Sequence, residues 1–232
     1  MKYIGIVVAM DEEMQEILKL MESTETKQVY DLKFIIGKIR NKNCVIVKSG
    51  VGKVNAARTT QILIDNFELE FVINTGVAGA INHLLNIGDV VIAKHVVQHD
   101  FDITAFGHSK GYITGVGEKI ICSRELVEEF EKMLKNIEER IYNIKIGIVA
   151  SGDIFCTQID MKNKINAKFN ADVVDMECAS VGQVCYLDNI PFISVRCISD
   201  IPNGNNQNTY DENLKLASKR CANIISEFLK SH

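Results

Sequence analysis

Apolar runs rich in β-branched residues alternate with stretches of helical periodicity along the chain, and this alternation limits the possible folds more than any other feature. Residues 3–10 form the first such run, and the apolar residues of 11–21 then follow helical spacing. Alternation of this kind predicts an α/β fold around a mostly parallel sheet. Further strands are expected at 34–39, 44–47, 71–75, 89–97, 145–150, 173–175 and 192–198, and further helices at 52–67, 123–137, 160–169, 178–187 and 209–230.

The length and composition predict one globular domain that spans residues 1–232. A hydrophobic fraction of 47% and a charged fraction of 24% are ordinary for a protein with one sizeable core. The net charge is −4 and no run of basic residues occurs, which argues against nucleic acid or an anionic membrane as a partner because both require clustered Lys and Arg. A small-molecule ligand is therefore expected.

Cysteine and histidine usage argues against disulfides and metal centres. The seven cysteines are an odd number, none forms a Cys-x-x-Cys pair, and most lie within apolar runs, so they predict reduced, buried thiols and a cytoplasmic protein. The apolar run 4–10 is too short to span a membrane and is followed by three acidic residues rather than by a cleavage site. The five histidines lack metal-binding spacing, so no metal site is expected.

Residues with useful chemistry gather where the expected strands end. In parallel sheets, ligands bind beyond the carboxyl ends of the strands. The segments at these ends contain carboxylates, small residues and one aromatic ring, a composition suited to a ligand that carries hydroxyl groups and a flat ring. These segments are 10–13, 75–79, 151–155, 176–177 and 199–200.

Four acidic residues at these ends have both a functional and a purely structural interpretation. Asp175 and Glu177 follow a buried run and lie on the same side of an extended chain, which calls for a partner or a ligand, but they could equally lie in water at the start of a helix. Glu13 could be an ordinary acid of a first helical turn. Asp200 precedes the turn-rich segment 201–206, which suits a mobile flap. Burial beneath such a flap would raise the pKa of Asp200, as a proton donor near neutral pH requires, whereas the alternative is an exposed loop acid.

The glycine-containing segments match no complete nucleotide-binding motif. Residues 48–53 read Lys-Ser-Gly-Val-Gly-Lys, but a P-loop would require Gly at the position of Val47 and Ser or Thr at the position of Val54. Residues 76–79 lack the full dinucleotide fingerprint, although their two glycines would let a ligand approach the backbone; a simple turn after a strand is the alternative. The segment 98–118 is expected to be a long functional loop.

A set of motifs, in order along the chain, resembles the 5′-methylthioadenosine/S-adenosylhomocysteine nucleosidase family of the nucleoside phosphorylase superfamily. The resemblance covers essentially the whole chain and implies a three-layer α/β/α fold with a central mixed, mostly parallel sheet flanked by helices. It also implies a homodimeric hydrolase without a cofactor, which cleaves the N-glycosidic bond of 5′-methylthioadenosine, S-adenosylhomocysteine and 5′-deoxyadenosine in methionine salvage. The motifs lie at 5–13, 48–54, 73–79, 99–107, 151–155, 175–177 and 196–200.

The resemblance implies roles for individual residues. Glu13 would position and activate a water molecule, and Asp200 would protonate N7 of the adenine leaving group. Glu177 would hold the ribose hydroxyls, and Phe106 would reach into the site of the neighbouring subunit. The other residues expected to line the substrate site are Gly79 and Met176 at the ribose, Phe155 against the purine, Cys156 through its backbone at the base edge, and Ala9, Val51, Val77, Ser199 and Tyr210.

The proposed carboxylates also suit this reaction on chemical grounds. Cleavage of the bond between C1′ and N9 builds positive charge on the ribose and negative charge on the purine, so it needs an acid at the base, an anion near the sugar and a water molecule on the opposite face. The alternatives are an aminofutalosine hydrolase, a purine nucleoside phosphorylase and a nucleoside-binding protein without catalysis. Phosphate binding requires a cluster of Arg donors, and the related phosphorylases carry arginines near the positions where this chain has Glu12, Glu13, Asn74 and Thr75.

Five residues depart from the pattern of the best-known family members. These departures affect the size and polarity of the pocket for the 5′ substituent, and hence the preference among substrates, rather than the expected proton donor and water activator. They are Val77 in place of Ser, Cys156 in place of an aliphatic residue, Asp175 in place of Glu, His108 in place of an aromatic residue and Tyr210 in place of Phe.

Overall fold

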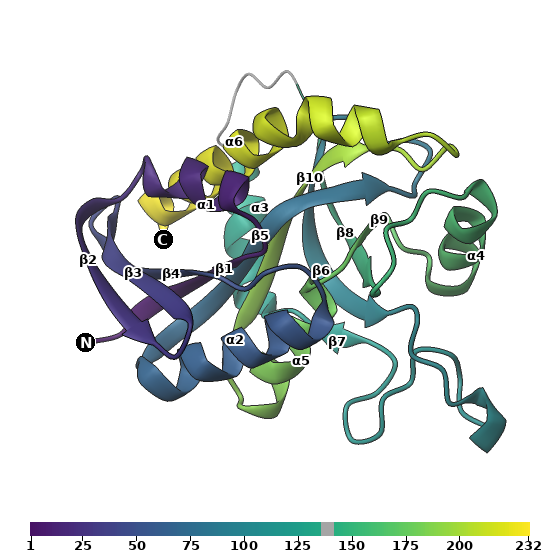
Figure 1. Ribbon diagram of the computed structural model, residues 1–232, viewed down its shortest axis with the longest axis horizontal. Coiled ribbons are helices and arrows are strands. Elements are labelled where there is room, and N and C mark those ends of the chain that lie inside the picture. The colour runs from purple at the N-terminus through teal and green to yellow at the C-terminus, as the bar shows by residue number, and fades with distance from the viewer. Residues whose placement is uncertain (136–141) are drawn as a thin grey trace.

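The structure, a computed structural model, describes residues 1–135 and 142–232. Within these residues a ten-stranded mixed sheet is flanked by helices, which confirms the expected α/β fold (Figure 1). The strands are β1 (Tyr3–Val8), β2 (Glu22–Val29), β3 (Leu32–Ile39), β4 (Lys42–Lys48), β5 (Leu69–Ala80), β6 (Val90–Gln98), β7 (Ile120–Ile121), β8 (Ile144–Ser151), β9 (Val173–Asp175) and β10 (Phe192–Asp200). The helices are α1 (Asp11–Leu18), α2 (Lys53–Asn66), α3 (Arg124–Lys135), α4 (Ile159–Phe169), α5 (Cys178–Leu187) and α6 (Gln207–Ser231), with a short 3₁₀ turn, η1 (Thr104–Phe106).

Two blocks of parallel strands form the centre of the sheet. In the first block β4, β1, β5 and β10 are neighbours in that order, and in the second block β6, β8 and β9 are neighbours. Antiparallel pairs join the blocks, since β10 pairs with β6 and β5 pairs with β9. As a result β5, β10, β6, β8 and β9 form a closed ring of strands. The antiparallel strands β3 and β2 extend the sheet beyond β4.

Helices cover both faces of the sheet, and its inner strands are therefore buried on both sides. The helices α1, α3 and α6 pack on one face, and α2 and α5 pack on the other (Figure 1). Successive side chains of β1 point to opposite faces of the sheet. Ile6 packs in the hydrophobic core on the side of α1, α3 and α6, and Val7 packs in the core on the side of α2 and α5. The helix α4 packs separately against β8, where Ile165 and Phe169 join a third cluster.

The strand β2 is the element that the sequence pattern does not indicate. Its residues are almost all polar and exposed, so no alternation of apolar and polar side chains marks it as a strand. Antiparallel pairing with β3 gives it its conformation. An edge strand of this kind depends on its neighbour rather than on its own burial, and a sequence pattern therefore misses it.

The alternative interpretation of 76–79 as a turn after a strand is wrong, because β5 continues through these residues to Ala80. Gly76 pairs with Arg196 of β10, and the register continues to Gly79 beside Asp200. A Cβ atom at Gly76 would collide with the side chains of Glu13 and Arg196. The glycine therefore allows two side chains to approach the strand rather than allowing the strand to turn.

Helix starts differ from the predictions by small amounts. The helix α6 begins at Gln207, two residues before the expected start at 209, with Asn206 as its N-cap. Ser123 precedes α3 as expected, and its Oγ accepts the Leu126 N–H at 3.4 Å. The last two residues of the helix expected at 123–137 lie outside the described part of the chain.

The described residues show no disulfide, no metal-binding cluster and no membrane-spanning helix. All seven cysteines are free and buried. Between residues 1–135 and 142–232, no helix has the length and apolarity needed to cross a bilayer. In the same residues, no three side chains from His, Cys, Asp and Glu gather in a way that could hold a metal ion.

Candidate active site

A cavity opens at the carboxyl ends of β1, β5, β9 and β10, which bring together segments that are far apart in the sequence. Cys156 lies in a small pocket that shares Phe155, Met176 and Asp200 with this cavity. Phe106 lies outside the cavity on the η1 turn, where it is 81% exposed. The expected site residues that the structure places in the cavity wall are Ala9, Glu13, Val51, Val77, Gly79, Phe155, Met176, Glu177, Ser199, Asp200 and Tyr210.

Glu13 lies in the first turn of α1, and three backbone N–H groups hold its carboxylate. Oε2 accepts from Ala9 at 2.8 Å and from Met10 at 3.1 Å, and Oε1 accepts from Val77 at 3.0 Å. Glu13 is 4% exposed. Burial raises its pKa above the usual value for Glu, although the charge of Arg196 and the three hydrogen bonds oppose this effect. A carboxylate with a raised pKa is a stronger base, and it can therefore take a proton from water.

Glu177 follows β9 and occupies the N-cap position of α5. Its Oε1 accepts the N–H of Gly52, just before α2, at 2.8 Å. Burial and the charge of Asp175 raise the pKa of Glu177 to about 7, while the Gly52 hydrogen bond lowers it. Residues 48–53, which resemble a P-loop only in part, thus help to form the site, because the backbone of Gly52 orients the side chain of Glu177 in the cavity.

Asp200 is the last residue of β10 and is 1% exposed. Ser199 Oγ donates a hydrogen bond to Oδ1 at 2.8 Å, and Asn206 Nδ2 donates one to Oδ2. Burial raises the pKa of Asp200, and both hydrogen bonds lower it. A raised pKa keeps this carboxyl group protonated closer to neutral pH, as a general acid requires.

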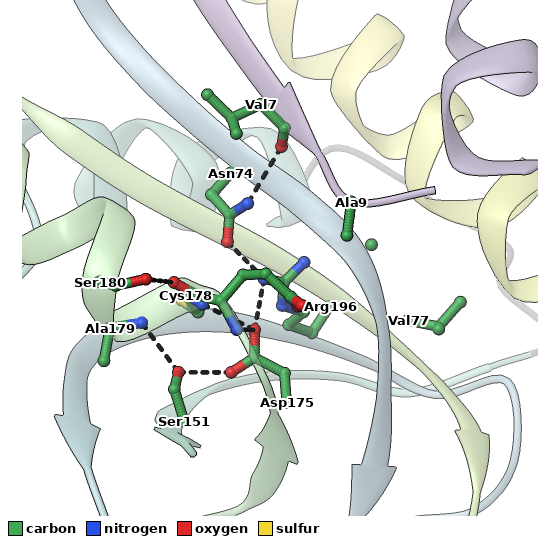
Figure 2. Close-up of polar contacts among 12 residues, drawn as sticks. Val7, Ala9, Asn74, Val77, Ser151, Asp175, Cys178, Ala179, Ser180 and Arg196 are labelled. Carbon is green, nitrogen blue, oxygen red and sulfur yellow. Dashed lines mark hydrogen bonds and ion pairs between the residues drawn. The ribbon is translucent and has the colours of Figure 1, made fainter. Parts of the chain in front are cut away.

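Asp175 has a buried partner, which answers the question that its position in the sequence raises. Arg196 donates from Nη2 to Asp175 Oδ2 and to Asn74 Oδ1, and Ser151 Oγ donates to Asp175 Oδ1 (Figure 2). Asn74 in turn donates from Nδ2 to the Val7 carbonyl oxygen at 3.0 Å. Buried charges require such partners. The network therefore fixes a cation behind the cavity wall that partly balances the carboxylates.

An aromatic pair forms one side of the cavity. The rings of Phe155 and Tyr210 meet edge to face, with centroids 5.5 Å apart and an angle of 76° between the ring planes. The Tyr210 hydroxyl donates to Met10 Sδ at 3.1 Å. Aromatic and thioether groups of this kind suit a flat, apolar ring system as ligand.

Some residues of the cavity wall were not among the expected binding residues. Gln207 lies one helical turn before Tyr210 on α6, but the predicted helix began at 209 and therefore did not include it. The others lie close to expected residues in the sequence. The additional wall residues are Met10, Ala78, Val174, Asp175 and Gln207.

The fold is that of the phosphorylase superfamily, whose family model matches residues 3–230. A 5′-methylthioadenosine/S-adenosylhomocysteine nucleosidase of Staphylococcus carnosus is 38% identical over 229 residues, which cover 98% of this chain and 99% of the relative. The nucleosidase of the same name from Bacillus cytotoxicus is 38% identical and is covered to 98% on both sides. The chain belongs to the 5′-methylthioadenosine/S-adenosylhomocysteine nucleosidase family.

A solved structure supports this relationship in three dimensions. The nucleosidase of S. pneumoniae with a transition-state inhibitor has a TM-score of 0.94 with this chain at 33% identity. The superposition covers 100% of this chain and 99% of the other. The similarity therefore includes the strands whose ends form the cavity.

Proposed function

We propose that the chain hydrolyses the N-glycosidic bond of 5′-methylthioadenosine and S-adenosylhomocysteine, and also that of 5′-deoxyadenosine. The products are adenine and the ribose that carries the 5′ substituent. One observation carries the proposal: Glu13, Glu177 and Asp200, which are distant in the sequence, line one cavity. Relatives that are 38% identical over nearly the whole chain are nucleosidases named for the first two substrates.

The three acidic side chains have complementary tasks in this reaction. As the bond between C1′ and N9 breaks, its electron pair passes to the purine, and Asp200 transfers a proton to N7. The carboxylates of Glu13 and Glu177 stabilise the positive charge that develops on the ribose. Glu177 also accepts hydrogen bonds from the ribose hydroxyls. Glu13 takes a proton from the water molecule that attacks C1′.

The remaining wall residues orient the nucleoside. Phe155 stacks on the purine, the backbone of Cys156 binds the base edge, and Met176 packs along the ribose. A Cβ atom at Gly79 would lie 3.2 Å from Asp200 Oδ2. The absence of a side chain there leaves room for the ribose and base beside the proton donor.

The charge of the cavity favours water over phosphate as the nucleophile. Its described wall includes four acidic residues, Asp175 among them, and neither Lys nor Arg. Arg196 lies behind the wall, where it is bound to Asp175 and Asn74. Bound phosphate would lack cationic partners and would face the carboxylates at close range, whereas a neutral water molecule meets no such repulsion.

Product analysis in phosphate-free buffer tests the proposed function. The purified chain is incubated with 5′-methylthioadenosine, S-adenosylhomocysteine or 5′-deoxyadenosine, and adenine and the free pentose are measured by chromatography. We expect stoichiometric adenine and pentose without phosphate. Turnover that begins only when phosphate is added, with a pentose 1-phosphate as product, would show that the enzyme is a phosphorylase. Binding without turnover would show that it is only a nucleoside-binding protein.

We also propose that the chain acts as a homodimer in which Phe106 completes the partner's cavity. Phe106 is a large apolar side chain on an exposed turn, and such a side chain gains stability when a partner covers it. We expect Phe106→Ala to raise KM for 5′-methylthioadenosine about tenfold or more, because burial of a Phe side chain contributes roughly 1.5–3 kcal/mol. Steady-state kinetics measures KM, and analytical ultracentrifugation measures whether the chain is a dimer.

A matched control separates this effect from the general loss of a surface ring. Tyr30 is 77% exposed at the turn between β2 and β3, and Tyr30→Ala should leave KM unchanged. If Phe106→Ala also leaves KM unchanged, or if the wild-type chain sediments as a monomer at assay concentrations, the role assigned to Phe106 is wrong.

The state of the cysteines supports a cytoplasmic location. All seven thiols are free and buried. Burial raises the pKa of Cys156 to about 11 and keeps that thiol in its less reactive, protonated form. Free thiols in such number are typical of proteins that work in a reducing compartment.

A further inference from the structure

The segment 201–206 ends in a buried asparagine whose side chain joins two parts of the base site. Asn206 is the N-cap residue of α6 and is 0% exposed. Its amide nitrogen, Nδ2, donates one hydrogen bond to Asp200 Oδ2 and a second to the carbonyl oxygen of Cys156 at 3.1 Å. Both N–H groups of the amide are therefore used, one for each part of the site.

The surroundings of Asn206 fix the orientation of this amide. Its oxygen, Oδ1, is buried and has no hydrogen-bond partner. A rotation of the amide by 180° would place Oδ1 against the Cys156 carbonyl oxygen, and the ionised carboxylate of Asp200 would lose its donor. The observed orientation leaves one acceptor without a partner, and in exchange it directs both donors to Asp200 and Cys156.

The two acceptors have different functions in the proposed reaction. A Cβ atom at Gly79, which lines the cavity, would lie 3.2 Å from Asp200 Oδ2, whereas Asp200 Oδ1 accepts a hydrogen bond from Ser199. Cys156 follows Phe155 in the segment that binds the purine. A backbone hydrogen bond from Gly204 N–H to the Thr157 carbonyl oxygen, at 2.8 Å, runs beside the Asn206 contacts. Asn206 thus connects the acid directly to the purine-binding segment.

We propose that Asn206 is a positioning residue for proton transfer, which holds Asp200 Oδ2 at a fixed place relative to the base and stabilises the carboxylate that remains after the proton has left. This inference rests on the proposed role of Asp200 as the proton donor. In the step itself the O–H bond of Asp200 breaks, a bond from the proton to purine N7 forms, and the electron pair of the glycosidic bond stays on the purine. Negative charge then appears on Asp200.

A hydrogen bond from Asn206 is stronger to this carboxylate than to the neutral acid. Hydrogen bonds to an ionised acceptor are roughly twice as strong as those between neutral groups. Asn206 therefore favours the state after the transfer, and it opposes the rise in the pKa of Asp200 that burial causes. Without Asn206 the acid would hold its proton more tightly and would donate it less readily.

The pH dependence of Asn206→Leu distinguishes this role from a structural one. Leu has a similar size and lacks the donor. We expect kcat for 5′-methylthioadenosine to fall about 10- to 100-fold, a part of the roughly 10²- to 10⁴-fold contribution of a general acid. We also expect the alkaline limb of the kcat profile to move to higher pH, because Asp200 keeps its proton longer. The carboxyl ¹³C shift of Asp200 should show the same displacement during titration.

Asn205→Leu is the matched control, because Asn205 is the exposed neighbour of the same residue type. It should keep the wild-type kcat and alkaline limb. Asn206→Ala provides a second, smaller variant if Asn206→Leu does not fold, and it should show the same upward displacement.

An unchanged alkaline limb in a folded Asn206 variant would overturn the proposal, whatever the loss of kcat. The wild-type enzyme and Asp200→Asn, assayed in parallel, test the proposed function separately. If the wild-type chain releases adenine and Asp200→Asn does not, the proposed function stands. This holds even if the Asn206 variants contradict the positioning role.

Discussion

The variant Asp200→Asn is expected to lower kcat for 5′-methylthioadenosine by about 10²- to 10⁴-fold, the usual contribution of a general acid. Asn has nearly the same shape as Asp, but it holds no carboxyl proton for N7 of the purine, and its one amide oxygen cannot accept from both Ser199 and Asn206. Substrate binding should be largely retained, because the wall residues remain in place. Single-turnover kinetics and equilibrium binding of a non-hydrolysable analogue measure the two quantities.

The pH profile provides an independent check on the same residue. Burial raises the pKa of Asp200, so the protonated form persists closer to neutral pH and is lost as the pH rises through that raised value. The wild-type enzyme should therefore lose activity on the alkaline side, and the residual activity of Asp200→Asn should lack this limb. Asp188→Asn alters an exposed residue at the end of α5 and should change nothing. Near wild-type turnover in Asp200→Asn would remove Asp200 from the mechanism.

The variant Glu13→Gln is expected to lower kcat by a similar factor, about 10²- to 10⁴-fold, because the amide is not a base. Each carboxylate oxygen of Glu13 accepts at least one backbone N–H, from Ala9, Met10 and Val77. In either orientation, the NH₂ group of Gln would meet a backbone donor. The variant should therefore lose a hydrogen bond as well as the base, and its thermal unfolding must be measured together with its kinetics.

The neighbouring residue offers a control for Glu13. Glu12 is exposed in the same helical turn, and Glu12→Gln should keep the wild-type rate and stability. On the acid side, the wild-type rate should fall as Glu13 gains a proton, and burial moves this limb towards higher pH. A Glu13→Gln enzyme that hydrolyses 5′-methylthioadenosine at the normal rate would show that another group activates the water.

The sequence predicts the location of the site better than it predicts the local geometry. The rule that ligands bind at the ends of buried strands places Glu13, Glu177 and Asp200 together, because each directly follows or ends such a strand or begins the next helix. The same pattern suggested that Gly76 begins a turn, whereas the strand continues. Pattern alone cannot show that this glycine makes room for side chains from α1 and β10.

Long-range polar contacts are the other part that the sequence does not reveal. Arg196 lies within an apolar run, and nothing in the sequence indicates that its partners are Asn74 and Asp175. Asn206 lies in a turn-rich segment whose composition favours a loop, and only the fold brings its amide to Asp200 and Cys156. Contacts of this kind depend on how strands pair in space, which periodicity does not encode.

The bare Cα at Gly76 also restricts how this catalytic centre can evolve. A Cβ atom there would lie 2.2 Å from Glu13 Oε1 and 2.8 Å from Arg196 Nη1. Any larger residue at Gly76 would displace the carboxylate on which hydrolysis depends, so this position is closed to side chains that could add a cation to the wall. We therefore expect a substitution at Gly76 to be tolerated only together with a compensating change at Glu13 or Arg196.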